Sequence, residues 1–105
     1  ASSEVEVFDS YPVLTNSDEE TEFAKALALE VFGEEGVLES ISPMNASEDF
    51  AFMLQKRPGC YFLLGNGEKG GKGGCMVHNS GYDFNDDIIS TGATLFVRLV
   101  ETHCR

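Results

Sequence analysis

The chain has 105 residues, of which 42% are hydrophobic and 24% are charged, and these proportions are typical of one ordinary globular domain with one modest core. Seven Lys and Arg against eighteen Asp and Glu give a formal net charge of -11, which repels phosphate backbones and anionic lipid headgroups. No apolar run approaches the roughly 20 residues that span a bilayer. The composition therefore disfavours nucleic-acid and membrane partners.

The first residues and the cysteines bear on the cellular setting. The start, Ala1 to Glu4, lacks the basic and apolar regions of a signal peptide and also lacks an initiator Met. We expect the chain to be a piece of something longer, although processing or cloning would leave the same start. The three cysteines are odd in number and widely spaced, so they do not signal a disulfide framework. A reducing compartment is expected, and we predict a cytoplasmic protein.

The first part of the chain predicts a strand, a helix and a second strand. Charged and apolar residues alternate over residues 4–7, which is typical of a short half-buried strand. Ser17 and Glu20 have the spacing of a capping box, and apolar residues recur three or four positions apart until Gly33. This pattern predicts a helix over about residues 18–32. Residues 36–41 are expected to form a short strand.

The middle of the chain predicts a second helix and a buried strand. Ser47 is expected to cap the helix, with Glu48 in the first turn, where negative charge meets the positive end of the helix dipole. The helix should end near Lys56, because the next residue precedes a proline. The continuous apolar run over residues 60–64 then predicts a strand covered on both faces.

The last part predicts a loop and a helix. Six of the ten residues from Gly65 to Gly74 are Gly, which favours a loop. A final helix is expected over about residues 86–102, capped by Asn85 or Asp86. Because strands and helices alternate along the chain, we predict the α/β fold class, with a partial layered sheet and helices against it.

No single motif in this stretch identifies a site. Residues 65–70 satisfy G-x-G-x-x-G after a predicted strand, but the glycines that follow make the required helix costly, so a surface loop is the better interpretation. His78 alone would more often be an ordinary surface or hydrogen-bonded histidine. Its position between a buried strand and a helix, where ligand sites of open α/β sheets lie, makes it a candidate ligand residue.

Several segments taken together carry a stronger signal. They are Pro-Met-Asn-Ala-Ser-Glu-Asp-Phe at 43–50, Pro-Gly-Cys-Tyr-Phe-Leu-Leu-Gly-Asn-Gly at 58–67, Met-Val-His-Asn at 76–79 and Tyr-Asp-Phe-Asn-Asp at 82–86. In order and spacing they resemble the closing section of the hippurate hydrolase and N-acyl-amino-acid amidohydrolase family, and the resemblance covers nearly the whole chain. Ala46 stands where that family commonly has Gly, and Ser80 where it commonly has Pro. These departures leave the acyl group and the amino acid of the substrate open.

The resemblance implies a metallopeptidase-like catalytic domain with a small lid domain inserted. Residues 1–16 would form a strand and linker at the exit from the lid, and residues 17–105 the C-terminal part of the catalytic α/β domain. Such enzymes bind one or two divalent metals (zinc, manganese, cobalt or nickel) and hydrolyse the amide between an acyl group and an amino acid. By position, His78 matches the family's last metal-ligating histidine, and Ser47 and Glu48 belong to a segment that borders the active site, as substrate-pocket residues or as supports of a metal ligand.

The resemblance also implies what this chain does not carry. The family's other metal ligands, its general-base glutamate and the lid histidine belong to chain that precedes Ala1, so we expect no complete catalytic set and little or no metal binding by this chain alone. The expected function is that of an incomplete, inactive C-terminal fragment of a metal-dependent amidohydrolase. Its partners would be hippurate-like N-acyl amino acids and either further copies of itself or a missing N-terminal part.

Three alternatives stay open. The chain could be a non-enzymatic module from this family that self-associates or binds a partner, or part of a dipeptidase or carboxypeptidase of the same clan. For Glu48, a helix N-terminal charge is as good an interpretation as a site role. Two expectations concern the structure itself. We expect His78 to lie partly exposed at the carboxyl end of the 60–64 strand, near a cleft that contains Ser47 or Glu48. We also expect some apolar surface of the chain to stay uncovered.

Overall fold

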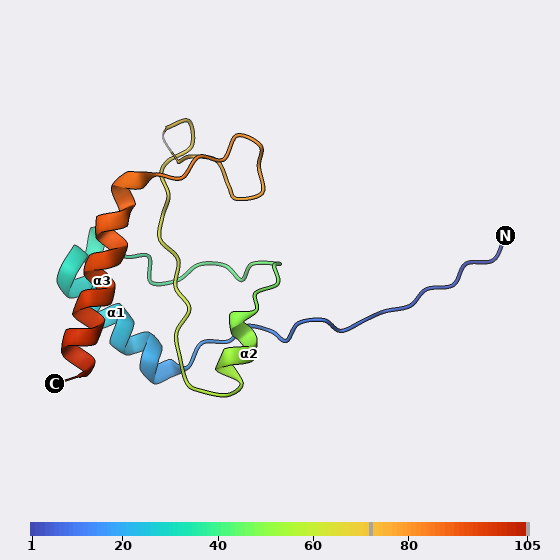
Figure 1. The fold of residues 1–105 in the computed structure, drawn as a ribbon, viewed down its shortest axis with the longest axis horizontal. Coiled ribbons are helices and arrows are strands. Elements are labelled where there is room, and N and C mark those ends of the chain that lie inside the picture. The colour runs from blue at the N-terminus through green and yellow to red at the C-terminus, as the bar shows by residue number, and fades with distance from the viewer. Residues whose placement is uncertain (72, 105) are drawn as a thin grey trace.

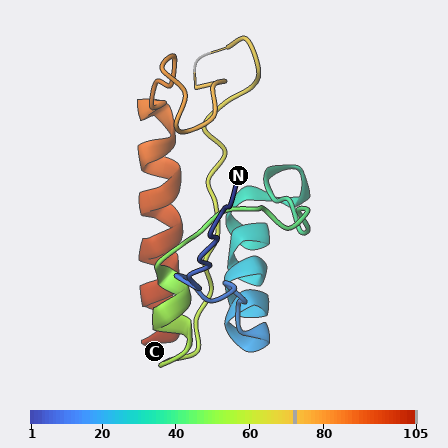
Figure 2. The same cartoon turned by 90° about the vertical axis from the view of Figure 1, so that its right-hand side faces the viewer.

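The computed structural model describes residues 1–71 and 73–104. Its elements are α1 (Asp18–Phe32), the 3-10 helix η1 (Glu34–Gly36), α2 (Phe50–Leu54), the 3-10 helix η2 (Asp86–Ile88) and α3 (Ile89–His103). The helices α1 and α3 lie side by side, and the extended residues 60–64 run beside them (Figures 1 and 2). Residues 1–10 stretch away from this body (Figure 1). Lys72, inside the predicted glycine-rich loop, and Arg105, the last residue of the predicted catalytic part, lie outside the described residues.

The first helix has the bounds that the apolar spacing predicts. Ser17 occupies the N-cap with an extended backbone (φ -80°, ψ 136°), and the first turn carries three acidic side chains, which meet the positive end of the helix dipole. Ala24 and Leu27 are the buried residues of α1. The helix ends at Gly33, whose φ of 73° belongs to the left-handed region that glycine enters without a steric cost.

The capping box predicted for Ser17 and Glu20 does not form. The Ser17 side chain makes no cap hydrogen bond; its Oγ accepts from the backbone N–H of Gly59 at 3.1 Å. The Ser17 backbone N–H in turn donates to the Gly59 carbonyl at 2.9 Å. A long-range contact has thus replaced the local one, and Ser17 joins the start of α1 to the chain that follows α2.

The last helix is also confirmed, with a tighter first turn than the sequence indicates. Residues 86–88 form η2, and α3 continues from Ile89 to His103. Asn85 is the cap, since its Oδ1 accepts from the backbone N–H of Asp87 at 3.2 Å. Gly92 and Leu95 are buried in α3. The Phe96 ring lies 5.7 Å from the ring of Phe62, which holds the extended 60–64 segment against the helix.

The predicted α/β layered sheet is wrong. Within residues 1–71 and 73–104 there is no strand, and the three segments predicted as strands, 4–7, 36–41 and 60–64, pair with no neighbouring backbone. Val5 and Val7 are 81% and 82% exposed, so the alternating pattern there buries no face. Alternation and apolar runs predict which faces want burial, but a strand also needs a second strand whose N–H and C=O groups it can bond.

A side chain takes the place of a partner strand at Tyr61, within the extended residues 60–64. The Asn16 carboxamide accepts from the backbone N–H of Tyr61 at 2.8 Å and donates to the carbonyl of the same residue at 2.8 Å. These two bonds reproduce what a neighbouring strand offers to one residue of an antiparallel pair. The segment is therefore extended and anchored without belonging to a sheet.

The second helix is shorter than predicted. The helix expected to start after a Ser47 cap and end near Lys56 is reduced to α2, Phe50–Leu54, with Asp49 at the N-cap and Gln55 at the C-cap. Ser47 lies two residues before Asp49 and is not the N-cap of the helix, so its predicted capping role is wrong. Turn-type bonds from the Lys56 and Arg57 N–H groups to the Met53 carbonyl, at 2.9 and 3.0 Å, end the helical segment before Pro58.

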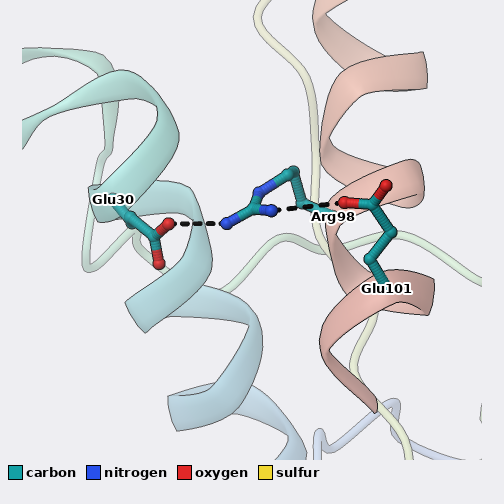
Figure 3. Close-up of polar contacts among 3 residues, drawn as sticks. All are labelled: Glu30, Arg98 and Glu101. Atoms are coloured by element: carbon teal, nitrogen blue, oxygen red, sulfur yellow. Dashed lines mark hydrogen bonds and ion pairs between the residues drawn. The ribbon is translucent and has the colours of Figure 1, made fainter. Parts of the chain in front are cut away.

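Charged side chains connect α1 to its neighbours. Arg98 of α3 donates from Nη2 to Glu30 of α1 at 2.6 Å and from Nη1 to Glu101, one turn further along α3, at 3.2 Å (Figure 3). Lys25 pairs with Glu39 at 2.9 Å and so ties the chain after η1 back to α1. All of these side chains are open to solvent, which screens their attraction, so the pairs orient the elements more than they stabilise the fold.

The core is small for a chain of this length. The buried hydrophobic residues of the described part are Ala24, Leu27, Ala51 and Leu95. The exposed surface of 8941 Å² exceeds the roughly 5800 Å² expected of a compact protein of 11.4 kDa. The radius of gyration of 17.4 Å likewise exceeds the roughly 13 Å of a compact domain. No helix in the described part of the chain is long and apolar enough to cross a membrane.

Candidate functional site

His78 lies in the loop that joins the glycine-rich segment to η2, drawn in orange beside the N-terminal start of α3 in Figure 1. The residue is exposed, and its φ of 65° makes it the non-glycine residue with a left-handed backbone in the described part of the chain. A tight turn follows it: the Asn79 Oδ1 accepts from the Gly81 N–H at 2.8 Å, and the Asn79 carbonyl accepts from the Tyr82 N–H at 2.9 Å. A non-glycine residue held in this region costs about 1–3 kcal/mol, and such residues cluster at functional sites.

The same loop is fixed at both ends by Asn66. The Nδ2 of Asn66 donates to the Gly73 carbonyl at 3.0 Å and to the Asp83 carbonyl at 3.0 Å. Its Oδ1 accepts from the Asn85 N–H at 2.9 Å. Asn66 is half-buried, and it thereby connects the glycine-rich loop, the loop of His78 and the start of η2.

Glu48 is bonded through both carboxylate oxygens. Oε1 accepts from the backbone N–H of Phe50 at 3.2 Å, and Oε2 accepts from the hydroxyl of Tyr61 at 3.1 Å. The bond from Phe50 contributes most to holding the pKa of Glu48 below its ordinary value of 4.5, and the Tyr61 hydroxyl adds to this effect. The Glu48 carboxylate in turn raises the pKa of the Tyr61 phenol above 10.0. The Phe50 and Tyr61 rings, 5.6 Å apart, pack beside this contact.

Ser47 is exposed, and its side chain forms no hydrogen bond within residues 1–71 and 73–104. The expectation that Ser47 or Glu48 shares one cleft with His78 therefore stays a prediction. An open cavity of about 630 Å³ lies between α1, the extended segment and α3, and its lining contains none of these three residues. Its lining residues are Val31, Phe32, Gly36, Leu63, Leu64, Gly65, Ile88 and Thr91.

The described residues offer one candidate metal ligand and not a complete metal site. Among them no group of three or more His, Cys, Asp or Glu side chains is placed to hold a metal ion. His78 is exposed and makes no hydrogen bond within the described part of the chain, so its ring nitrogens are available to a metal whose other ligands come from elsewhere. The three cysteines are free thiols.

Sequence reasoning missed the two carboxamides that organise the candidate site. Asn66 lies in one of the segments that carry the family resemblance and Asn16 precedes them, yet nothing in their spacing assigned them a role. The signal was their setting: each is a polar side chain at the edge of a structured segment, where a carboxamide can bond both an N–H and a C=O of the passing backbone.

The profile of peptidase family M20/M25/M40 matches residues 2–102, and the chain belongs to this family. It is 35% identical over 88 residues to the hippurate hydrolase of Campylobacter jejuni, an alignment that covers 84% of this chain and 22% of that protein. It is 31% identical over 87 residues to thermostable carboxypeptidase 2 of Saccharolobus solfataricus, covering 81% of this chain and 21% of that protein. It is 28% identical over 89 residues to IAA-amino acid hydrolase ILR1-like 5 of Arabidopsis thaliana, covering 85% and 20%.

The chain thus spans about a fifth of the length of the curated relatives it matches. No solved structure matches it. The family assignment confirms the resemblance to hippurate hydrolases, and the relatives include both amidohydrolases and carboxypeptidases. Peptidases of this family generally depend on divalent metals.

Proposed function

We propose that this chain is the C-terminal section of a metal-dependent hydrolase that cleaves the amide bond of hippurate-like N-acyl amino acids. The observation that carries the proposal is the 35% identity to a hippurate hydrolase over 84% of this chain. The chain covers only 22% of that relative, so the section alone is proposed to be inactive. A carboxypeptidase of the same family is the second candidate, because relatives of that kind match nearly as much of the chain.

In this proposal His78 is one ligand of a divalent metal, and Ser47 and Glu48 border the substrate pocket. When bound, such a metal polarises a carbonyl and lowers the pKa of a water molecule. The exposed, left-handed His78 supports the assignment, because a strained residue presented to solvent is typical of a functional site. The lowered pKa keeps the Glu48 carboxylate ionised to lower pH than an ordinary glutamate, and its bonds to Phe50 and Tyr61 fix the position of that charge.

The proposal is tested in a hybrid enzyme. The aligned section of the C. jejuni hippurate hydrolase is replaced by this chain, and hydrolysis of hippurate is measured with zinc, manganese or cobalt. We expect the hybrid to hydrolyse hippurate and His78→Ala to lower kcat/KM at least roughly 100-fold, because even partners of metal ligands cost 10- to 100-fold. His103→Ala is the matched control, since His103 is the other histidine of the chain and lies at the end of α3.

Two outcomes of the hybrid experiment contradict the proposal. A hybrid that binds metal yet hydrolyses only peptides, and no N-acyl amino acid, would favour the carboxypeptidase. A His78→Ala hybrid as active as the His103→Ala hybrid would remove His78 from the metal site. The His103→Ala change removes a ring contact with Phe23 and no proposed metal ligand, so it is expected to alter kcat/KM by no more than about twofold, the equivalent of roughly 0.5 kcal/mol for an exposed substitution.

The isolated chain provides a separate prediction. Incubated with hippurate and zinc, manganese or cobalt, it is expected to show no hydrolysis above the buffer rate, because its described residues contain no group of three metal ligands. Turnover that disappears in His78→Ala would contradict this, and it would mean that several copies assemble a site between them.

Self-association is the function we propose for the chain outside catalysis, because so much apolar surface is left uncovered.

A further inference from the structure

One side chain controls both ends of the loop that presents His78. The Asn66 carboxamide has two N–H donors and a carbonyl acceptor, and in the structure it both donates and accepts, to residues 7 to 19 positions further along the chain. One donated bond reaches Gly73, before the loop, and the other reaches Asp83, after it. The accepted bond, from Asn85, extends the contact to the N-cap residue of η2.

We propose that Asn66 is the positioning residue of His78. Residues 74–82 contain no helix, and the hydrogen bonds described for them are local, from Gly74 back to Gly71 and within the turn that follows His78. These local bonds shape the tip of the loop but do not fix it relative to the body of the molecule. Asn66 does this, because it holds the two loop ends to one point, and a loop with fixed ends samples far fewer conformations than one with free ends.

The backbone around Asn66 is built for this contact. Gly73 is buried and has a φ of 72°, and a Cβ at this position would collide with the backbone carbonyl oxygen of Asn66. Any larger residue at position 73 would therefore push the loop end away from Asn66. At the other end of the loop, the Asn85 N–H donates to Asn66 and the Asn85 side chain caps η2. The loop is thereby attached to the start of α3, which follows η2.

This inference deepens the proposed function. The positioning of His78 by Asn66 does not depend on that function, but its consequence for metal binding rests on His78 being a metal ligand. The first test is on the chain as it is, by NMR. We expect the two Nδ2 hydrogens of Asn66 to exchange more slowly than those of Asn79, whose side chain is bonded only through its oxygen. Equal exchange at the two residues would overturn the proposal without any mutation.

The second test compares two asparagine-to-aspartate variants. Asn66→Asp removes both donated bonds and turns a carboxylate toward two carbonyls, so the heteronuclear NOE of the amides of residues 74–82 should fall while those of α1 and α3 stay as they are. Asn79→Asp is the matched control in the same loop, because its oxygen still accepts from Gly81. Unchanged loop NOE values in Asn66→Asp, with the helices intact, would overturn the proposal.

The third test measures Zn²⁺ affinity in the hybrid enzyme. Asn66→Asp should weaken Zn²⁺ binding by up to about 10- to 100-fold, the loss that follows when a direct hydrogen-bond partner of a metal ligand is removed. Gln55→Glu makes the same amide-to-carboxylate change at an exposed position and should leave the affinity as it is. If His78→Ala does not weaken Zn²⁺ binding, the proposed function fails; if His78→Ala weakens it and Asn66→Asp does not, the positioning role of Asn66 fails.

Discussion

Glu48 is a candidate site residue that also connects two segments of this chain through hydrogen bonds. Its carboxylate bridges the first backbone N–H of α2 and the hydroxyl of Tyr61, and so connects the short helix to the extended segment. The rings of Phe50 and Tyr61 lie next to that bridge. Glu48 lies before the N-cap Asp49 and not in the first turn of α2, so its predicted place in the helix is wrong, although its carboxylate does bond the first N–H of α2. Its role at a substrate pocket stays a proposal.

The Glu48 bridge should depend on pH in a defined window. Because the folded pKa of Glu48 is lowered, the bridge stabilises the fold above pH 4.5 and loses this effect as the pH falls through the folded value. Because the folded pKa of Tyr61 is raised, its contribution is complete below pH 10.0 and is lost as the pH rises through the folded value. In Tyr61→Phe, a carbon-13 titration should show the Glu48 pKa moving up toward 4.5 without reaching it, since Phe50 still donates. An unchanged titration would show that the Tyr61 contact does not form in solution.

At the scale of elements, the sequence predicted the parts that depend on neighbours in the chain. The bounds of α1 and the position of α3 follow from apolar spacing, from Asn85 and from Gly33, all of which act within a few residues. The apolar run at 60–64 predicts a strand, but whether it becomes one depends on a partner backbone from elsewhere in the chain. In this chain the partner is the Asn16 carboxamide, 45 residues away from Tyr61, and a local pattern does not contain that information.

The candidate site divides in the same way. Family resemblance carried His78, Ser47 and Glu48 onto positions of this chain, and the left-handed backbone of His78 supports the first of them. Asn66 was missed because its bonds reach 7 to 19 residues ahead, across loops whose path the sequence does not specify. Ser47 was predicted as a cap because serine is a good cap, but α2 starts later, after Asp49.

The packing of α1 against α3 should depend on the buried Leu95 of α3. Leu95 is 4% exposed and belongs to the few buried residues of the described chain, whereas Leu63 is 51% exposed. Leu95→Ala is expected to lower the free energy of unfolding by about 2–5 kcal/mol, and the same change at Leu63 by much less. Thermal unfolding followed by circular dichroism of the helices measures both. Equal losses in the two variants would mean that α1 and α3 do not pack in solution as they do in the structure.

For the whole molecule, the balance between surface and core is the dominant feature. The molecule extends over 63 × 38 × 20 Å, and large apolar side chains stay exposed on α3 as well as on the N-terminal segment. On α3 the exposed side chains Ile89, Phe96, Val97 and Val100 lie along one side of the helix, and Gly92 and Leu95 are buried on an adjacent side. A helix whose apolar surface is this wide is typical of a buried helix, so α3 here lacks part of its expected surroundings.

Self-association follows from that uncovered side of α3. This side carries a shallow apolar hollow of about 310 Å³ lined by Phe96, Val97, Val100 and Glu101. The whole chain has a net charge of -11, but α3 contains one Arg and one Glu, whose charges cancel. The face of α3 therefore carries little of the acidic charge of the chain. We expect light scattering at micromolar concentration to give a mass above 11.4 kDa, and a mass that rises with salt, because salt screens the repulsion between acidic copies.

Two variants of α3 distinguish a specific contact from general stickiness. Val100→Asp places a charge on the apolar side and should return the chain to 11.4 kDa, because burying an unpaired carboxylate in the contact is too costly. Thr94→Asp adds the same charge at an exposed position away from that side and should leave the larger mass unchanged. A wild-type chain that scatters as a monomer of 11.4 kDa and binds no hydrophobic dye would contradict the prediction, because its apolar surface would then have to be closed within a single copy.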